Sequence, residues 1–411
     1  MELKINYQYT YFIYPYAIKQ TKYKKYITNM LKNKRYKLEL FDSFKDIDLY
    51  NYFLPSVRNS MFQDFTFTKE KINAFNKLSN SNKYRELLNQ NCITFEYNLE
   101  EVMQGKIQEK DGIFFKILKI EIVCLKNGIC FLLFKTHIEE TDKFSDLLNF
   151  NYKFGNINLE NKSLKKLEQI KIQTDAFSNI KKISEIITDI TGKRVNSRNI
   201  DINDDMFLTY SYVCIDSENW NKDTDFENIK NEFIKFSNVL PSNTNVNVDY
   251  DKLTMITNSS FMRLRINNKG SFLICSSTDQ NNYTKIPSIY ERQYLYTYLI
   301  SLGQRYYLKK LSKEFNNKKQ NKKTLNKFIN FTKDIWINEV TTEGLGQKIY
   351  KRCKEKMNLE ELYYEVKVKY DTFYKNLKIE KNEKQNKVII IMLIVAILLG
   401  ISNLASWMFF K

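Results

Sequence analysis

The feature that most constrains this chain is its last apolar stretch, Val388–Phe410, which contains no charged side chain. As an α-helix it would be about 35 Å long, at about 1.5 Å per residue, and a hydrocarbon core is about 30 Å thick. A buried core helix is the alternative. Such helices usually keep a polar face, however, and no polar residue occurs here before Ser402. The sequence therefore predicts one C-terminal membrane-spanning helix.

Charges on either side of this span predict its orientation. Four lysines between residues 378 and 387 lead into the span, and Lys411 alone follows it. Positively charged flanks stay in the cytoplasm, and Met1–Tyr11 lacks the apolar run of a secretory signal. We therefore expect a tail-anchored protein of the bacterial inner (cytoplasmic) membrane, with the bulk of the chain, residues 1–387, in the cytoplasm.

The clearest local element before the span is a β-hairpin, Ile113–Ile138. Its turn is Asn127-Gly128, a pair that is typical of turns in which both central residues take a positive φ. The return strand, Ile129–Phe134, is apolar on both faces. We therefore expect a central strand that is covered on both sides.

Other elements are predicted from their local pattern. An aromatic strand within Tyr7–Ile18 is expected to halt at Pro15, because proline has no N–H to donate to a neighbouring strand. The polar run Asn149–Lys162 is expected to form a loop, and Ser163–Ile172 a helix. A second hairpin is predicted within Phe261–Cys275.

After Cys275 the pattern changes from strands to helices. Helical spacing of apolar residues begins near Pro287, Thr324 and Gln347 and continues towards the span. We therefore predict an α+β fold in three successive parts. These are a cytoplasmic mixed α/β domain with β-hairpins (1–276, with two subdomains that would meet near 150–162), a helical stalk region (277–387) and one transmembrane helix (388–410).

The formal net charge of the chain is +18, which favours an anionic partner. Because of the span, an anionic lipid surface is the first candidate, a soluble anionic ligand is the second, and nucleic acid is disfavoured. A solvated basic surface without a partner is the alternative. The residues that we expect to face lipid or ligand are Lys22, Lys24, Lys25, Lys34, Arg35, Lys384 and Lys387.

Motifs for catalysis or cofactor binding are scarce in this sequence. With only ten glycines, it contains neither a dinucleotide-binding pattern nor a P-loop. Its six cysteines form no C-x-x-C pair, so we predict buried thiols and no metal site. We expect the protein to be no enzyme and to bind no cofactor. A hydrolase is the alternative, and its candidate residues are His137, Asp201, Asp204 and Asp205.

Small residues within the span predict self-association. Ala396 and Gly400 are four residues apart, as are Ser402 and Ser406, and such pairs let two helices approach closely. Asn403 adds a polar side chain that could bond a neighbouring chain within the membrane. We therefore expect a homo-oligomer in the lipid bilayer.

The order of these parts resembles that of the CorA-type divalent-cation channels. In that family a cytoplasmic α/β domain leads into a helical section, and a long stalk helix runs into the membrane within a ring of five chains. Asn358–Lys387 would be the stalk here, although Trp407–Lys411 stands where the family's Gly-Met-Asn signature would follow the first span. The resemblance implies an oligomeric channel or a ligand-sensing membrane effector. The alternative is a membrane-tethered binding or scaffold protein that conducts no ions.

Overall fold

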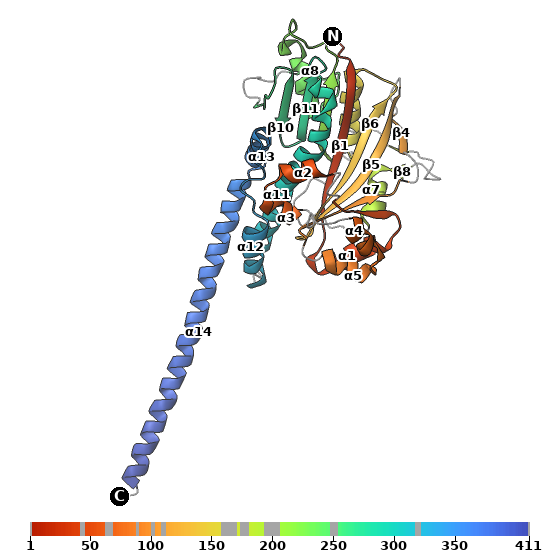
Figure 1. Ribbon diagram of the computed structural model, residues 1–411. Helices are drawn as coiled ribbons and strands as arrows, with labels where there is room; N and C mark the ends of the chain where they lie inside the picture. Colours follow the sequence, from red (N-terminus) through yellow and green to blue (C-terminus); the bar gives the residue numbers. More distant parts are fainter. Residues whose placement is uncertain are drawn as a thin grey trace.

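One nine-stranded sheet, mixed in strand direction, forms the centre of the part of the chain that the structure describes (Figure 1). This structure is a computed structural model, and it describes residues 2–41, 46–61, 69–87, 90–99, 103–107, 112–157, 171–172, 181–192, 206–246, 254–316 and 322–409. The strands of the sheet are β1 (Ile5–Ala17), β2 (Tyr36–Glu39), β3 (Cys92–Tyr97), β4 (Met103–Ile107), β5 (Ile113–Leu125), β6 (Ile129–Glu139), β9 (Leu208–Ile215), β10 (Met262–Ile266) and β11 (Gly270–Ser276). Their order is β10-β11-β9-β1-β6-β5-β3-β2, with β4 beside β5.

Strand β1 lies in the middle of this sheet, antiparallel to β6 on one side and to β9 on the other. Its side chains alternate between two hydrophobic cores. Tyr9 and Tyr11 belong to the core on one face, called here the first face, and Phe12 and Tyr14 belong to the core on the second face. A strand buried on both faces needs apolar or aromatic residues at nearly every position, which β1 supplies.

The second face is covered by helices that lie before residue 240 in the chain. Their buried residues include Tyr23, Phe150, Ile186 and Phe233. These helices are α1 (Gln20–Lys32), α4 (Lys69–Lys77), α5 (Asn80–Glu86), α6 (Phe144–Gly155), α7 (Ile183–Thr191), the 3-10 helix η3 (Phe226–Ile229) and α8 (Lys230–Asn238). A separate two-stranded sheet pairs β7 (Lys171–Ile172) with β8 (Lys181–Lys182).

The first face lies under helices from near residue 50 and from the C-terminal part of the chain, which complete a three-layer arrangement. Their buried residues include Leu49, Leu299, Ile349 and Val366. These helices are α2 (Ile47–Tyr52), α3 (Pro55–Met61), α9 (Asn281–Thr284), α10 (Ile286–Ile289), the π-helix η5 (Tyr290–Tyr294), α11 (Leu295–Phe315), α12 (Lys322–Asp334), α13 (Gly344–Lys356) and the beginning of α14 (Leu359–Phe409).

Buried tyrosines fix the start of this C-terminal layer on the sheet. The Tyr9 hydroxyl donates to the Pro287 carbonyl at 2.6 Å, and the Tyr210 hydroxyl donates to the Tyr290 carbonyl at 2.7 Å. The rings of Tyr210 and Tyr290 also stack, with their centroids 4.2 Å apart. Carbonyl groups at the irregular beginning of a helix thus gain partners from the sheet below. The tyrosine-rich strands therefore hold two layers together.

The coarse fold prediction is confirmed, because the chain forms a mixed α/β structure followed by one long C-terminal apolar helix. Both predicted hairpins form, as β5–β6 and as β10–β11. Strand β6 lies between β1 and β5 and is buried along most of its length, as expected of a central strand. The two subdomains within 1–276 stay a prediction, although strands from both sides of 150–162 share one sheet.

The turn of the first hairpin differs from the predicted type. Gly128 has a φ of 84°, whereas Asn127 is not among the residues with a positive φ. The N–H of Gly128 donates to the Leu125 carbonyl at 2.8 Å, a pattern typical of a type I turn followed by a left-handed glycine. A Cβ atom on Gly128 would lie 2.4 Å from the Ile18 carbonyl oxygen. The position therefore requires glycine for its backbone conformation and for its close contact.

The prediction that Pro15 halts the first strand is wrong. Strand β1 continues to Ala17, and Pro15 lies opposite Phe131 of β6. Pairing with β9 ends at Ile13, so β1 has a neighbour on one side only where Pro15 occurs. A strand segment with one unpaired side tolerates proline, because no ladder bond is lost there.

Two predictions for the region after the first hairpin are also wrong. Residues 149–155 belong to α6 and form no loop, because Phe150 and Phe154 pack into the core of the second face. Lys171–Ile172 forms β7, although it was predicted as the end of a helix. The rest of that predicted helix lies outside the described residues.

Candidate functional site

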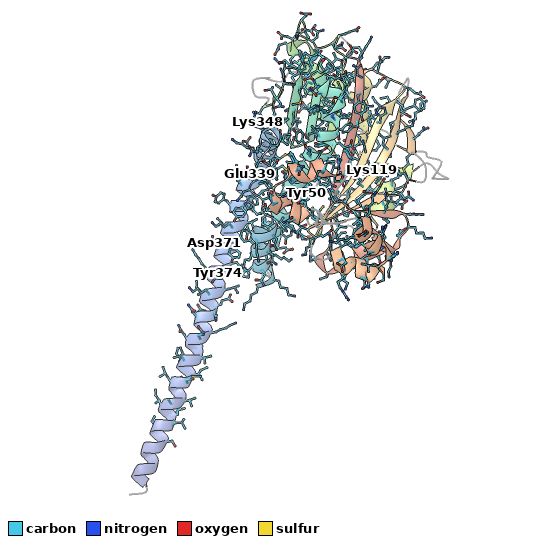
Figure 2. All side chains as sticks on the ribbon, in the orientation of Figure 1. Tyr50, Lys119, Glu339, Lys348, Asp371 and Tyr374 are labelled. Atoms are coloured by element: carbon cyan, nitrogen blue, oxygen red, sulfur yellow. The ribbon has the colours of Figure 1, made fainter. Side chains whose placement is uncertain are left out.

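The first turns of α14 pack firmly against α11 and α12. Val366 is fully buried. The rings of Phe328 and Tyr370 lie 5.0 Å apart, and those of Phe315 and Phe373 lie 6.4 Å apart. Figure 2 labels Asp371 and Tyr374 on this same part of α14. The helix that carries the apolar stretch is therefore an integral part of the helical layer on the first face.

Beyond residue 377, α14 leaves the domain and continues alone (Figure 1). Every residue from Lys378 to Ser402 is exposed. Among the described residues, α14 is the one helix that is long and apolar enough to cross a membrane, by length and composition. None of its apolar window is buried in this chain, so it does not form a buried core helix here.

The predicted association residues occupy two faces of this helix. Each residue turns an α-helix by about 100°. Ala396, Gly400 and Asn403 therefore share one face, whereas Ser402 and Ser406 lie on the opposite one. At Gly400 no atom lies within 4 Å of the place that a Cβ would occupy. The small-residue face with Gly400 is open, and the two serines do not extend it.

The predicted basic residues fall into two groups that the structure does not bring together. Lys22, Lys24 and Lys25 are exposed on α1, whose buried residues belong to the core of the second face. Lys384 and Lys387 are exposed on α14, whose packed part belongs to the first face. Lys34 and Arg35, also exposed, follow α1. The sheet therefore separates the two basic groups (Figure 1).

His137 is a hydrogen-bonded residue near the end of β6. Its Nδ1 lies 2.9 Å from the backbone carbonyl oxygen of Gln8 and 3.1 Å from the side-chain nitrogen Nε2 of the same residue. The other hydrolase candidates, Asp201, Asp204 and Asp205, lie outside the described residues. Among the residues that are described, no group of three or more His, Cys, Asp or Glu could hold a metal ion.

Sequence reasoning missed a group of charged side chains on the first face of the sheet, called here the charged row. It consists of Glu39, Glu96, Lys119, Glu121, Lys135 and Glu291, from β2, β3, β5, β6 and η5. Glu96 lies opposite Glu121, and Lys119 lies opposite Lys135, in the strand register. In the sequence, the only indication of this row was that Lys119 and Glu121 occupy the same face of β5. The other members become their neighbours through the strand order, which the sequence does not reveal.

Two ion pairs organise the charged row. Lys119 Nζ lies 2.8 Å from Glu121 Oε1, and Lys135 Nζ lies 2.6 Å from Glu291 Oε1. The Tyr11 hydroxyl also donates to Glu291 Oε1, at 2.7 Å. These contacts link the sheet to the beginning of the C-terminal helical layer. Like charges face each other in the register, Glu96 with Glu121 and Lys119 with Lys135, so each lysine is neutralised by a carboxylate from another position of the row.

The pKa of the Glu39 carboxyl is shifted towards neutral pH. Burial and a hydrogen bond with Glu96 raise the pKa of Glu39 to about 6, although Lys119 and Lys37 act in the opposite direction. An ionised Glu39 is therefore less stable in the folded chain than in the unfolded one, where its pKa is 4.5. This penalty is absent below pH 4.5 and is complete once the pH has risen past about 6.

Glu39→Gln is therefore expected to stabilise the protein at pH 7. Because the side chain is about one-third exposed, solvent screening limits the gain to about 1 kcal/mol. The measurement is urea unfolding of both proteins at pH 7 and at pH 4. The free energy of unfolding of the variant should exceed that of the parent at pH 7 and equal it at pH 4. A Glu39→Gln protein that is less stable at pH 7 would show that the ionised form makes a favourable contact.

A groove of about 710 Å³ lies where the domain meets α14. It is lined by side chains of the loop before α13, of α13 and of the first turn of α14, including Glu339, Gln347, Lys351, Lys354 and Glu360. Lys354 Nζ lies 2.9 Å from Glu360 Oε1, which joins the two helices. Between them Asn358 has a φ of 53°, a left-handed conformation that asparagine tolerates better than most residues. Figure 2 labels Glu339 in this region.

Comparisons of the chain with protein-family models, with curated proteins and with solved structures gave no match. The resemblance to CorA-type channels therefore stays a prediction. The function has to be inferred from the residues of this chain.

Proposed function

We propose that this chain is a single-span protein of the bacterial inner membrane, with a large cytoplasmic domain that binds a ligand, and that it acts as an oligomeric CorA-like channel or membrane effector. One observation carries the proposal. Helix α14 runs without a break from its packed part on the domain into an apolar segment that no other described part of the chain covers. A continuous helix transmits a rotation or tilt at one end to the other end.

The groove at the start of α14 is the place where a ligand would act on this helix. Its lining comes from the domain and from the stalk, and the Lys354–Glu360 pair crosses between them. In this proposal, the stalk can meet the domain at more than one angle. A ligand that bound more tightly to the conformation with one of these angles would increase the population of that conformation. Asn358 supplies the joint between the two helices.

The bilayer is the second partner in this proposal. Lys384 and Lys387 lie within about 6 Å of the apolar segment along the helix axis, where anionic headgroups would surround them. The face with Ala396, Gly400 and Asn403 would contact further copies of the chain. The basic residues of α1 could meet a second lipid surface or an anionic ligand, because they are exposed on the opposite side of the sheet.

Purified full-length protein in a planar lipid bilayer is expected to give discrete current steps. Bilayers that receive detergent alone are the control. Current should appear or change when candidate ligands are added on the side of the large domain. If no ligand condition produces current, the protein is a membrane-tethered scaffold and the channel proposal is wrong.

A further inference from the structure

The part of α14 that packs on the domain leaves one face uncovered. This uncovered face, called here the axial face, runs from Tyr364 through Val368, Asp371 and Lys375 to Lys378, the first residue beyond the packed part, and all five residues are exposed. These residues recur at steps of three and four, the spacing of one face of a helix. The opposite face carries Val366, Tyr370 and Phe373, which pack against α11 and α12.

The axial face is continuous with the small-residue face of the apolar segment. The same spacing continues through Asn382, Gln385 and Ile389 to Ala396, Gly400 and Asn403. At about 100° per residue, all of these positions fall within a sector of about 100° around the helix. One straight face thus extends from the domain to the far part of the span.

Because the axial face and the face with Gly400 point in the same direction, the positions of the stalks and the domains in an assembly follow from the contact at Gly400. If copies meet through the face with Gly400, their stalks turn the axial face towards the common axis. The domains, which pack on the opposite face, then lie outside and do not obstruct the contact. Lys384 and Lys387 point away from the axis, towards lipid, because they lie about 200° and 140° around the helix from Tyr364.

The charge of the axial face is positive. Lys367, Lys375 and Lys378 fall within this sector and contribute three positive charges per chain. Asp371 and Glu360 contribute two negative charges, and Glu360 is paired with Lys354. Identical lysines around one axis repel one another and stay hydrated, and they concentrate anions between them. Rings of lysine are the arrangement found in anion-conducting pores, whereas cation channels use rings of carboxylates.

We propose that the cytoplasmic entrance of the assembly selects small inorganic anions, through rings formed by Lys375 and Lys378. This inference rests on the proposed oligomeric channel and specifies what the channel passes. It differs from the divalent cations that the CorA resemblance implies.

The test is a reversal-potential measurement on the full-length protein in a planar bilayer with a potassium chloride gradient. Chloride is expected to be several-fold more permeant than potassium. The double variant Lys375→Glu/Lys378→Glu should lower that ratio below one. Lys381→Glu is the control for the single variant Lys378→Glu, because it makes the same charge change about 60° around the helix from Lys378. Lys378→Glu should lower the ratio more than Lys381→Glu does.

The outcomes separate this inference from the proposal on which it rests. Currents that prefer potassium, or a ratio that the double variant leaves unchanged, overturn the anion selectivity while the channel stands. The absence of any current overturns both.

A cross-linking measurement tests the axial face without relying on conduction. The six native cysteines are buried, so a disulfide between chains can be assigned to a single introduced cysteine. Lys378→Cys should form a disulfide between chains under mild oxidation in membranes, and Lys381→Cys should not. Equal cross-linking at both positions would show that the axial face does not meet an axis.

Discussion

Gly270→Ala is expected to destabilise the protein by more than about 3 kcal/mol. Gly270 begins β11, and a Cβ atom there would lie 1.7 Å from the carbonyl oxygen of Thr209 in β9. The strand cannot move away, because it is paired with β9 on one side and with β10 on the other. The measurement is denaturant unfolding of the full-length protein in detergent, with tryptophan fluorescence as the signal.

The chain has three tryptophans, so Trp336 and Trp407 are replaced by phenylalanine in every protein compared, and Trp220 then reports on its own surroundings. Its ring centroid lies 5.3 Å from the guanidinium carbon of Arg263 in β10, so a displaced hairpin changes its surroundings. Gly344→Ala is the matched control, since no atom lies within 4 Å of the Cβ position at the start of α13. That variant should unfold at or above the midpoint of the parent. If Gly270→Ala behaves like Gly344→Ala, β11 and β9 are not in the close contact described.

Gly400→Leu is expected to dissociate the oligomer in detergent while the chain still inserts into membranes. The added side chain blocks the close approach of two helices, and leucine is favourable in lipid. Asn403→Leu should also weaken assembly, because an interhelical hydrogen bond contributes about 0.6–2 kcal/mol per contact, and these contacts add up around a ring. Light scattering of the detergent complex gives the mass, and membrane fractionation gives the extent of insertion.

Val395→Leu is the control for this pair, because it adds bulk on the opposite face of the helix and should leave the mass unchanged. The mechanism requires insertion and association to change in opposite directions. If Gly400→Leu and Asn403→Leu keep the mass of the parent, the span is an anchor only. Any oligomer is then held by the part of the chain before the span.

Elements with a strong local pattern could be predicted from the sequence. The two hairpins and the helices after residue 280 follow from alternation, from turn residues and from apolar residues at steps of three and four. The left-handed joint at Asn358 lies where the predicted stalk, Asn358–Lys387, begins. The Gly128 turn shows the limit of such reasoning, since the choice between turn types depends on strand twist and on the nearby carbonyl of Ile18.

The arrangement of these elements could not be predicted. Which helices cover which face depends on strand order. Strand β9 joins the sheet beside β1 although it follows β1 by about two hundred residues, and β11 and β10 extend the sheet beyond β9. The charged row depends on the same order, because Glu96 meets Glu121 only through the β3–β5 pairing. On a helix, by contrast, the spacing of residues along the sequence alone determines which residues share a face. The axial face could therefore have been recognised from the sequence once the packed face was known.

The position of β1 has a consequence for how the chain is made. Thr10 lies opposite Thr136 on one side and opposite Ser211 on the other. During synthesis, this aromatic strand emerges before β6 and β9, and both of its edges stay unpaired until each partner strand has been translated. Pairing across such separations is slow, and open strand edges bind other chains. Until both partner strands have been made, β1 is open to pairing with other chains, whatever the stability of the finished fold.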